Sequence, residues 1–95
     1  MALYKWKSSV TDEQIDEVFR RLTTLGPKIS GLMGVACTRN ESTYNQGYTH
    51  VIFVRAKDQT AIDTYRNHPE HIKIATIVES MEERGIGVDF TIPSL

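Results

Sequence analysis

The chain has 95 residues and a formal net charge of −1 at pH 7, with 11 basic and 12 acidic side chains. This length predicts one small domain, residues 1–95, which buries only about 60–65% of its unfolded surface and therefore gains from self-association. The balanced charge argues against strong binding to nucleic acid or anionic membranes, and no apolar run approaches the roughly 20 residues of a membrane span.

The N-terminus has no apolar stretch of the kind that directs secretion. Cys37 is the only cysteine, so no disulfide can form within the chain. A reducing compartment fits this composition, and we expect a cytoplasmic protein.

The first third of the chain predicts a strand followed by a helix. Residues 2–7 alternate between two sides, which is typical of a short strand. A helix is predicted over 12–25, because apolar residues recur there at helical spacing and because Thr11 and Gln14 have the spacing of a capping box. Gly26-Pro27 ends this helix.

Two further strands are predicted over 31–39 and 48–56, separated by a polar loop over 40–47. Both strands carry apolar residues on both sides, which indicates that both of their faces are covered. In the second strand one side is formed by Tyr48, His50, Ile52 and Val54, and the other by Thr49, Val51 and Phe53.

The last third predicts two helices and a strand. A short helix is expected over 58–66, and after the break at His68-Pro69 a second helix reaches about Arg84. Gly85 is expected as the C-cap of that helix. Residues 86–92 alternate between apolar and polar or small side chains and predict the final strand.

The order of these elements predicts an α+β fold. Two adjacent helices count as one, so the order becomes the βαββαβ pattern of ferredoxin-like domains, which pack their helices on one face of a four-stranded antiparallel sheet. The apolar character of both faces of the middle strands then calls for a second cover. We expect a homodimer in which two sheets meet face to face as a barrel.

The stretch from Tyr65 to His71, Tyr-Arg-Asn-His-Pro-Glu-His, contains two of the three histidines. Pro69 moves His68 out of the helical region and is suited to open a new helix. His71 then lies near the positive end of the helix dipole, which favours a neutral imidazole that accepts a proton. The alternative is that both histidines only cap and punctuate the junction, because structural histidines outnumber catalytic ones.

Two motifs of the chain are specific, Asn45-Gln46-Gly47-Tyr48-Thr49-His50 and the Tyr65–His71 stretch. Through these two motifs above all, the chain resembles the stress-responsive A/B-barrel (Dabb) family of dimeric α+β barrels. Weaker matches are Leu3-Tyr4-Lys5-Trp6-Lys7 with Val10-Thr11-Asp12-Glu13-Gln14-Ile15, Ile29-Ser30-Gly31-Leu32, and Val88-Asp89-Phe90. These matches cover nearly the whole chain in the order in which the family has them.

The resemblance implies a chemistry for two of these residues. A plant member of the family is a polyketide cyclase, in which the last histidine of the second motif is the base and the tyrosine is its partner. Those roles fall on His71 and Tyr65 here. An aldol cyclisation needs both a base between two carbonyls and a donor for the enolate, and neither a cofactor nor a metal is expected.

Such a site needs an apolar cavity for a carbonyl-rich small molecule. We expect its walls to include His50, Ile52, Phe53, Val54 and Met81. Two alternatives remain: a non-catalytic dimer with a filled interior and structural histidines, and a cofactor-free monooxygenase or isomerase on the same fold. A metal held by His50, His68, Glu70 and His71 is disfavoured, because Pro69 interrupts the helix that would align them.

Overall fold

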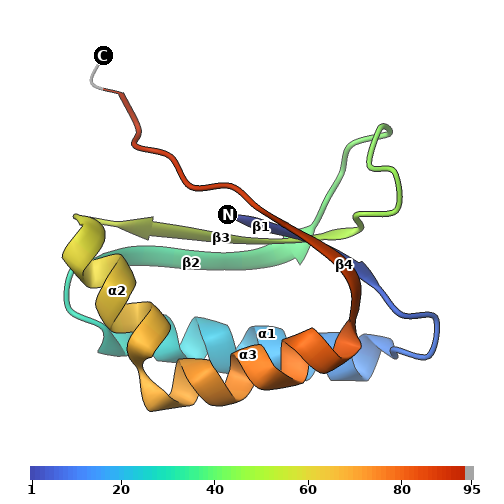
Figure 1. The fold of residues 1–95 in the computed structure, drawn as a ribbon, viewed down its shortest axis with the longest axis horizontal. Coiled ribbons are helices and arrows are strands. Elements are labelled where there is room, and N and C mark those ends of the chain that lie inside the picture. The colour runs from blue at the N-terminus through green and yellow to red at the C-terminus, as the bar shows by residue number, and fades with distance from the viewer. Residues whose placement is uncertain (94–95) are drawn as a thin grey trace.

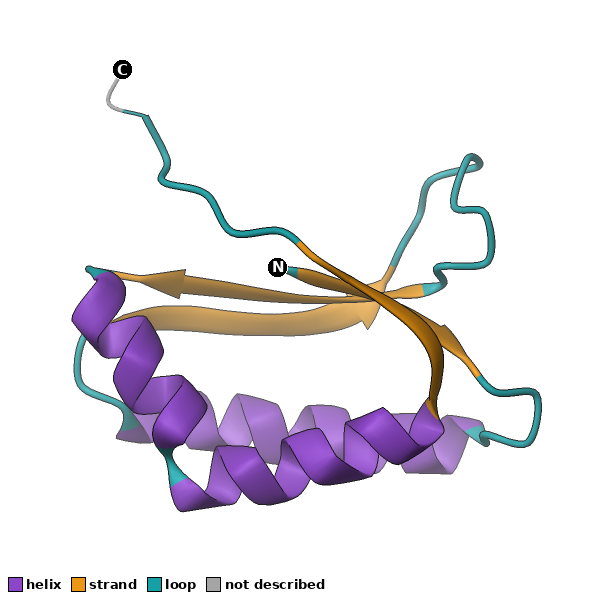
Figure 2. Cartoon of the chain, in the orientation of Figure 1, coloured by secondary structure: helices purple, strands orange, loops and turns teal. Residues whose placement is uncertain are grey.

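The computed structural model describes residues 1–93 and has a four-stranded sheet covered by helices on one face (Figures 1 and 2). The strands follow the order β2-β3-β1-β4, and every neighbouring pair is antiparallel. This arrangement confirms the predicted ferredoxin-like α+β fold. The elements are β1 (Ala2–Trp6), α1 (Asp12–Leu25), the 3₁₀ turn η1 (Gly26–Lys28), β2 (Leu32–Arg39), β3 (His50–Ala56), α2 (Gln59–Asn67), α3 (Pro69–Met81) and β4 (Glu82–Gly87).

Helix α1 forms where its sequence pattern predicts. Thr11 accepts a hydrogen bond from the Gln14 backbone, and the Gln14 side chain accepts one from the Thr11 backbone, which completes a capping box. The apolar stripe of α1 then packs with α3 and β3 into one core. The core residues are Ile15, Val18, Leu22, Leu25, Ile29, Ile52, Tyr65, Ile74, Val78 and Met81. None of the helices in the described part of the chain is long and apolar enough to span a membrane.

The end of α3 differs from the sequence-based prediction. The helix stops at Met81 instead of Arg84, and Gly85 lies inside β4 rather than at a helix C-cap. The backbone N–H of Lys7 donates to the Met81 carbonyl at 2.9 Å, and β4 pairs along the whole of β1. This long-range pairing overrides the helix propensity of the Glu-Glu-Arg sequence that follows Met81.

The final strand is also shifted, since it covers 82–87 instead of 86–92. Pairing with β1 ends where the Val88 N–H donates to the Met1 carbonyl at 2.7 Å. None of the four strands continues beside residues 88–92, which we call the terminal segment. Alternation of side chains is not sufficient for a strand, because a strand also needs a hydrogen-bonded neighbour.

The sheet has one face that the helices of this chain do not cover (Figure 2). The strand register places Leu3 directly between Val51 and Ile86 on this face, and Phe53 follows Val51 on the same side. We call this surface the open sheet face. Its centre is apolar, with Ile86 41% exposed, whereas Lys5, Arg55 and Arg84 lie on the same side further along the strands.

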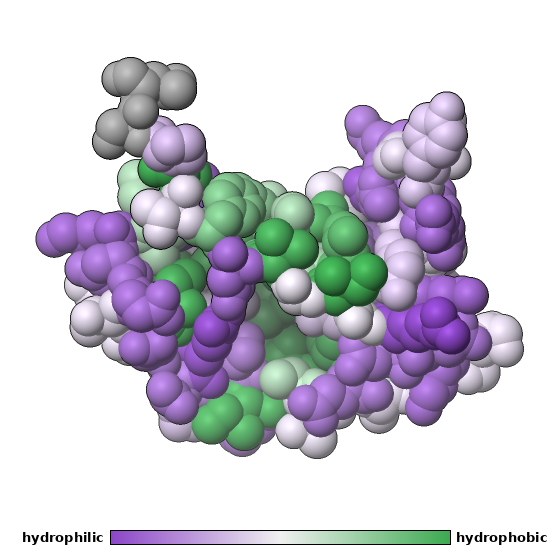
Figure 3. Space-filling model, turned by 45° about the horizontal axis from the view of Figure 1, so that its top comes forward, coloured by the Kyte–Doolittle hydropathy of each residue, from purple (hydrophilic) through white to green (hydrophobic). Residues whose placement is uncertain are grey.

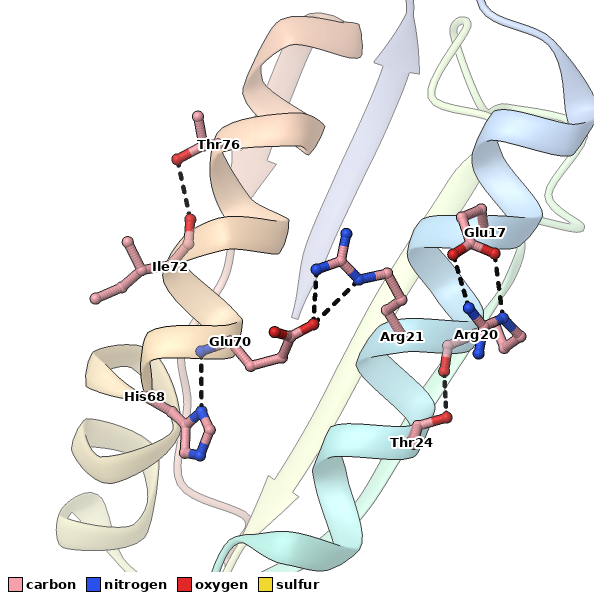
Figure 4. A network of polar contacts seen from close by, with 8 residues as sticks. All are labelled: Glu17, Arg20, Arg21, Thr24, His68, Glu70, Ile72 and Thr76. Atoms are coloured by element: carbon pink, nitrogen blue, oxygen red, sulfur yellow. Dashed lines mark hydrogen bonds and ion pairs between the residues drawn. The ribbon is translucent and has the colours of Figure 1, made fainter.

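The junction between α2 and α3 is built from a histidine and a proline. His68 has an extended backbone and is both the C-cap of α2 and the N-cap of α3. Its Nδ1 accepts a hydrogen bond from the Glu70 N–H at 3.0 Å, and Glu70 also pairs with Arg21 of α1 at 2.7 Å (Figure 4). The start of α3 is therefore fixed both by its own cap and by α1.

A second histidine, His50 at the start of β3, is buried in a polar contact with β1. The indole Nε1–H of Trp6 donates to His50 Nδ1 at 2.9 Å. Because the indole can only donate, this nitrogen must be unprotonated and the His50 ring neutral. Burial lowers the pKa of His50, and the nearby Arg39 lowers it further.

We expect the free energy of unfolding to decrease as the pH falls below 6.5, the ordinary histidine pKa. The pKa values of His50 and His71 are both lowered in the folded chain. As the pH falls, the unfolded chain therefore binds protons first and is stabilised relative to the folded chain. Above pH 6.5 the rings are neutral in both states and this contribution vanishes. Urea unfolding at several pH values between about 5.5 and 7.5 measures the slope.

The variant His50→Gln keeps an acceptor for Trp6 but does not titrate, so its slope should be smaller. His68→Asn is the matched control, because asparagine is a good N-cap, and it should keep the wild-type contribution from His50. An unchanged slope in His50→Gln would contradict the assignment.

Candidate functional site

A hollow of about 1020 Å³ lies between the sheet, helices α2 and α3, and the terminal segment. Figure 3 shows it as an opening with a hydrophobic floor, partly crossed by hydrophilic side chains. We call it the cavity. Its apolar lining includes Ile52, Val54, Ile74 and Val78 on the helix side of the sheet, and it extends past the sheet edge to Phe53 on the open sheet face and Phe90 in the terminal segment.

Tyr65 and His71 both line this cavity, and their ring centroids are 4.4 Å apart with an angle of 58° between the ring planes. Tyr65 is in the last turns of α2 and is 5% exposed, whereas His71 is in the first turn of α3 and half-buried. The break at His68-Pro69 turns the chain between them. Two residues from different helices therefore meet at one wall.

Burial lowers the pKa of His71. The Arg66 guanidinium lowers it further, while a hydrogen bond from the ring to the Arg66 backbone acts in the opposite direction. The imidazole is therefore neutral at pH 7, as expected from sequence, although burial is the leading cause. In a neutral imidazole one ring nitrogen carries no hydrogen, and that nitrogen can accept a proton.

Burial also raises the pKa of Tyr65. Its phenol consequently stays protonated at neutral pH and keeps a proton that it can donate in a hydrogen bond. No buried side-chain polar atom within residues 1–93 lacks a hydrogen-bond partner. The pair thus combines a neutral base and a neutral donor at one apolar wall, which is the combination that enolate chemistry requires.

The predicted wall residues divide into two groups. Ile52, Val54 and Phe53 line the cavity, with Phe53 also facing the ring of Phe90 in the terminal segment at 6.5 Å. His50 and Met81 are not among the residues that line it. His50 lies at the other end of β3 and borders a smaller hollow of about 240 Å³, and Met81 is packed in the core at the end of α3.

Sequence reasoning missed a charged pair at this site. Arg66 of α2 and Asp89 of the terminal segment both line the cavity and form an ion pair at 3.0 Å. Arg66 lies in the Tyr65–His71 stretch and Asp89 lies in the Val88-Asp89-Phe90 match. No sequence pattern predicts a contact between two residues that are 23 positions apart. Within residues 1–93, no group of three or more His, Cys, Asp or Glu side chains has the geometry to hold a metal ion.

Comparison with known proteins shows related sequences over the whole length of the fold. Olivetolic acid cyclase from Cannabis sativa is 26% identical over 93 residues, which cover 96% of this chain and 92% of the cyclase. The stress-response A/B barrel domain-containing protein HS1 from Arabidopsis thaliana is 27% identical over 90 residues, which cover 93% of this chain and 83% of that protein.

A solved structure has the same fold. It is a dimeric ferredoxin-like protein of unknown function from Thermobifida fusca, with a TM-score of 0.83 and 23% identity. The match covers 96% of this chain and 86% of that one. The family model of the stress responsive A/B barrel domain matches residues 1–92. These matches confirm the resemblance seen in the motifs, and the chain belongs to the stress-responsive A/B-barrel domain family.

Proposed function

We propose that this protein is a cofactor-independent enzyme of the cyclase type, acting on an apolar molecule with several carbonyl groups. The proposal rests on one observation: Tyr65 and His71 line the same apolar cavity, and their ring centroids are 4.4 Å apart. The similarity to olivetolic acid cyclase, at 26% identity, supports the same chemistry.

In the proposed reaction, the free ring nitrogen of His71 takes a proton from a carbon that lies between two carbonyls. The electron pair of that C–H bond moves onto the carbonyl oxygen, and the Tyr65 hydroxyl donates a hydrogen bond to this enolate. The enolate carbon then attacks a second carbonyl of the same molecule, which forms a C–C bond and an alkoxide. The imidazolium of His71 returns its proton to the alkoxide, so no other reactant is needed.

The three histidines have separate tasks in this proposal. His50 accepts the Trp6 hydrogen bond, and His68 caps α3. His71 is left with a lowered pKa and a place in the cavity wall. A purely structural set of histidines fits a filled interior, whereas the hollow beside His71 favours binding of a ligand.

The variant His71→Asn should cyclise a linear poly-β-ketone about 100- to 10,000-fold more slowly than the wild type, because it has lost the base. Tyr65→Phe should lower the rate without a matching loss of melting temperature, because it removes only the hydroxyl. Single-turnover assays of ring closure, followed by mass spectrometry or absorbance, measure both rates.

The matched control is His68→Asn, which changes a histidine three positions away while keeping an N-cap acceptor. Its rate should stay near that of the wild type. If His71→Asn cyclises as fast as the wild type, the proposed reaction is wrong and His71 is a structural residue.

We further propose that two copies of the chain associate through the open sheet face. This surface is apolar around Leu3, Val51 and Ile86. Burial of such a surface against a second copy stabilises the pair by about 25 cal/mol for each Å² of apolar area removed from water. The Thermobifida fusca protein with this fold is dimeric, which supports the same arrangement here.

The variant Ile86→Asp should convert the dimer into a monomer, because it places a charge in the middle of the apolar contact. Light scattering coupled to size-exclusion chromatography gives the mass of each species. Ile72→Asp is the control, since Ile72 is 53% exposed on helix α3 and lies away from the sheet. Equal masses for the wild type and Ile86→Asp would contradict this interface.

A further inference from the structure

The Arg66–Asp89 ion pair connects two parts of the cavity wall that the backbone does not join. Arg66 is in the last turn of α2, next to Tyr65, and Asp89 is in the terminal segment. Hydrophilic side chains cross the mouth of the hollow in Figure 3. Arg66, Asp89 and His71 line the same cavity, so a molecule that binds beside His71 is also close to this ion pair.

The guanidinium of Arg66 is only partly used by its partner. Its Nη2 donates to both carboxylate oxygens of Asp89, at 3.0 and 3.1 Å, and in the described part of the chain its Nε and Nη1 have no acceptor. Arg20 on α1 is different, since its Nε and Nη2 each bind a separate oxygen of Glu17 (Figure 4). Nη2 belongs to each of the two donor pairs with which a guanidinium binds a carboxylate through parallel hydrogen bonds, so a ligand carboxylate can bind Arg66 in this way only after it displaces Asp89.

The Asp89 contact is also easily replaced. The side chains of Arg66 and Asp89 are 50% and 70% exposed, and exposed ion pairs of this kind contribute little to stability. Because its side chain is 70% exposed, the Asp89 carboxylate can be hydrated when another carboxylate takes its place at the guanidinium.

The charges of the cavity wall favour an anionic group at this end. Arg55, Lys57 and Asp58 line the cavity where β3 ends and α2 begins, and Glu79 and Glu82 line it at and just after the end of α3. Glu79 is eight residues from His71, or about 12 Å along a helix. Arg66 instead follows Tyr65, whose ring centroid is 4.4 Å from that of His71. A carboxylate would therefore bind beside the base and away from the glutamates.

We propose that Arg66 is the residue that recognises a carboxylate on the ligand, and that Asp89 occupies its place while the cavity is empty. The inference rests on the proposed function, and it narrows the substrate class to apolar, carbonyl-rich molecules that carry a carboxylate. The carboxylate fixes one end of the molecule, so that its carbonyl groups extend along the apolar wall toward His71 and Tyr65.

The test compares two probes with the same alkyl chain, octanoate and 1-octanol, in binding titrations followed by NMR of the His71 and Tyr65 rings at pH 7. The wild type should bind octanoate about tenfold more tightly than octanol, a typical effect of one charge-assisted hydrogen-bonded contact. Arg66→Gln should abolish this preference and leave octanol binding unchanged. Asp89→Asn should strengthen octanoate binding several-fold, because the internal competitor is removed.

Arg20→Gln is the matched control, because it removes the same charge from a surface outside the cavity, and it should keep the preference. Equal binding of both probes, or no change in Asp89→Asn, overturns the inference and leaves the proposed reaction standing. Lys57 is another cation in the cavity lining. A preference that survives Arg66→Gln but is lost in Lys57→Gln also overturns the inference, because Lys57 and not Arg66 then binds the carboxylate. If neither probe binds, the cavity itself is not a ligand site.

Discussion

The site depends on one constraint, the proline that follows His68. Proline cannot continue α2 and is well placed to begin α3, so the chain must turn between Tyr65 and His71. The cap from His68 to Glu70 and the link from Glu70 to Arg21 hold that turn in place. Without the turn, two residues six positions apart would lie on one continuous helix, more than one turn from each other.

Burial then gives the two side chains their chemical character. The same apolar wall lowers the pKa of His71 and raises that of Tyr65, so that base and donor are both neutral at pH 7. This character has a cost in stability, because a buried neutral histidine makes the folded chain more sensitive to acid. The proposed acid–base role of this pair and the acid sensitivity therefore have the same physical cause.

Interactions between distant parts of the chain decided the features that the sequence did not predict. The residues after Met81 pair with the edge of β1 and form β4, although their propensity favours a helix. The contact with Trp6 keeps His50 at the far end of β3, outside the cavity. Arg66 and Asp89 form their ion pair because the terminal segment passes the end of α2. A local sequence pattern does not predict a contact between two such distant segments.

The sequence by itself determined the number and order of the strands and α-helices, the capping box of α1, the break at His68-Pro69 and the family. These features depend on spacing within one or two turns of chain, where periodicity and proline sterics act directly. Only the tertiary structure decided where α3 ends, which of the predicted wall residues line the cavity and which ion pair lines it with them. Those properties arise from strand pairing and burial between residues far apart in the chain, and their energies depend on neighbours that a local pattern does not specify.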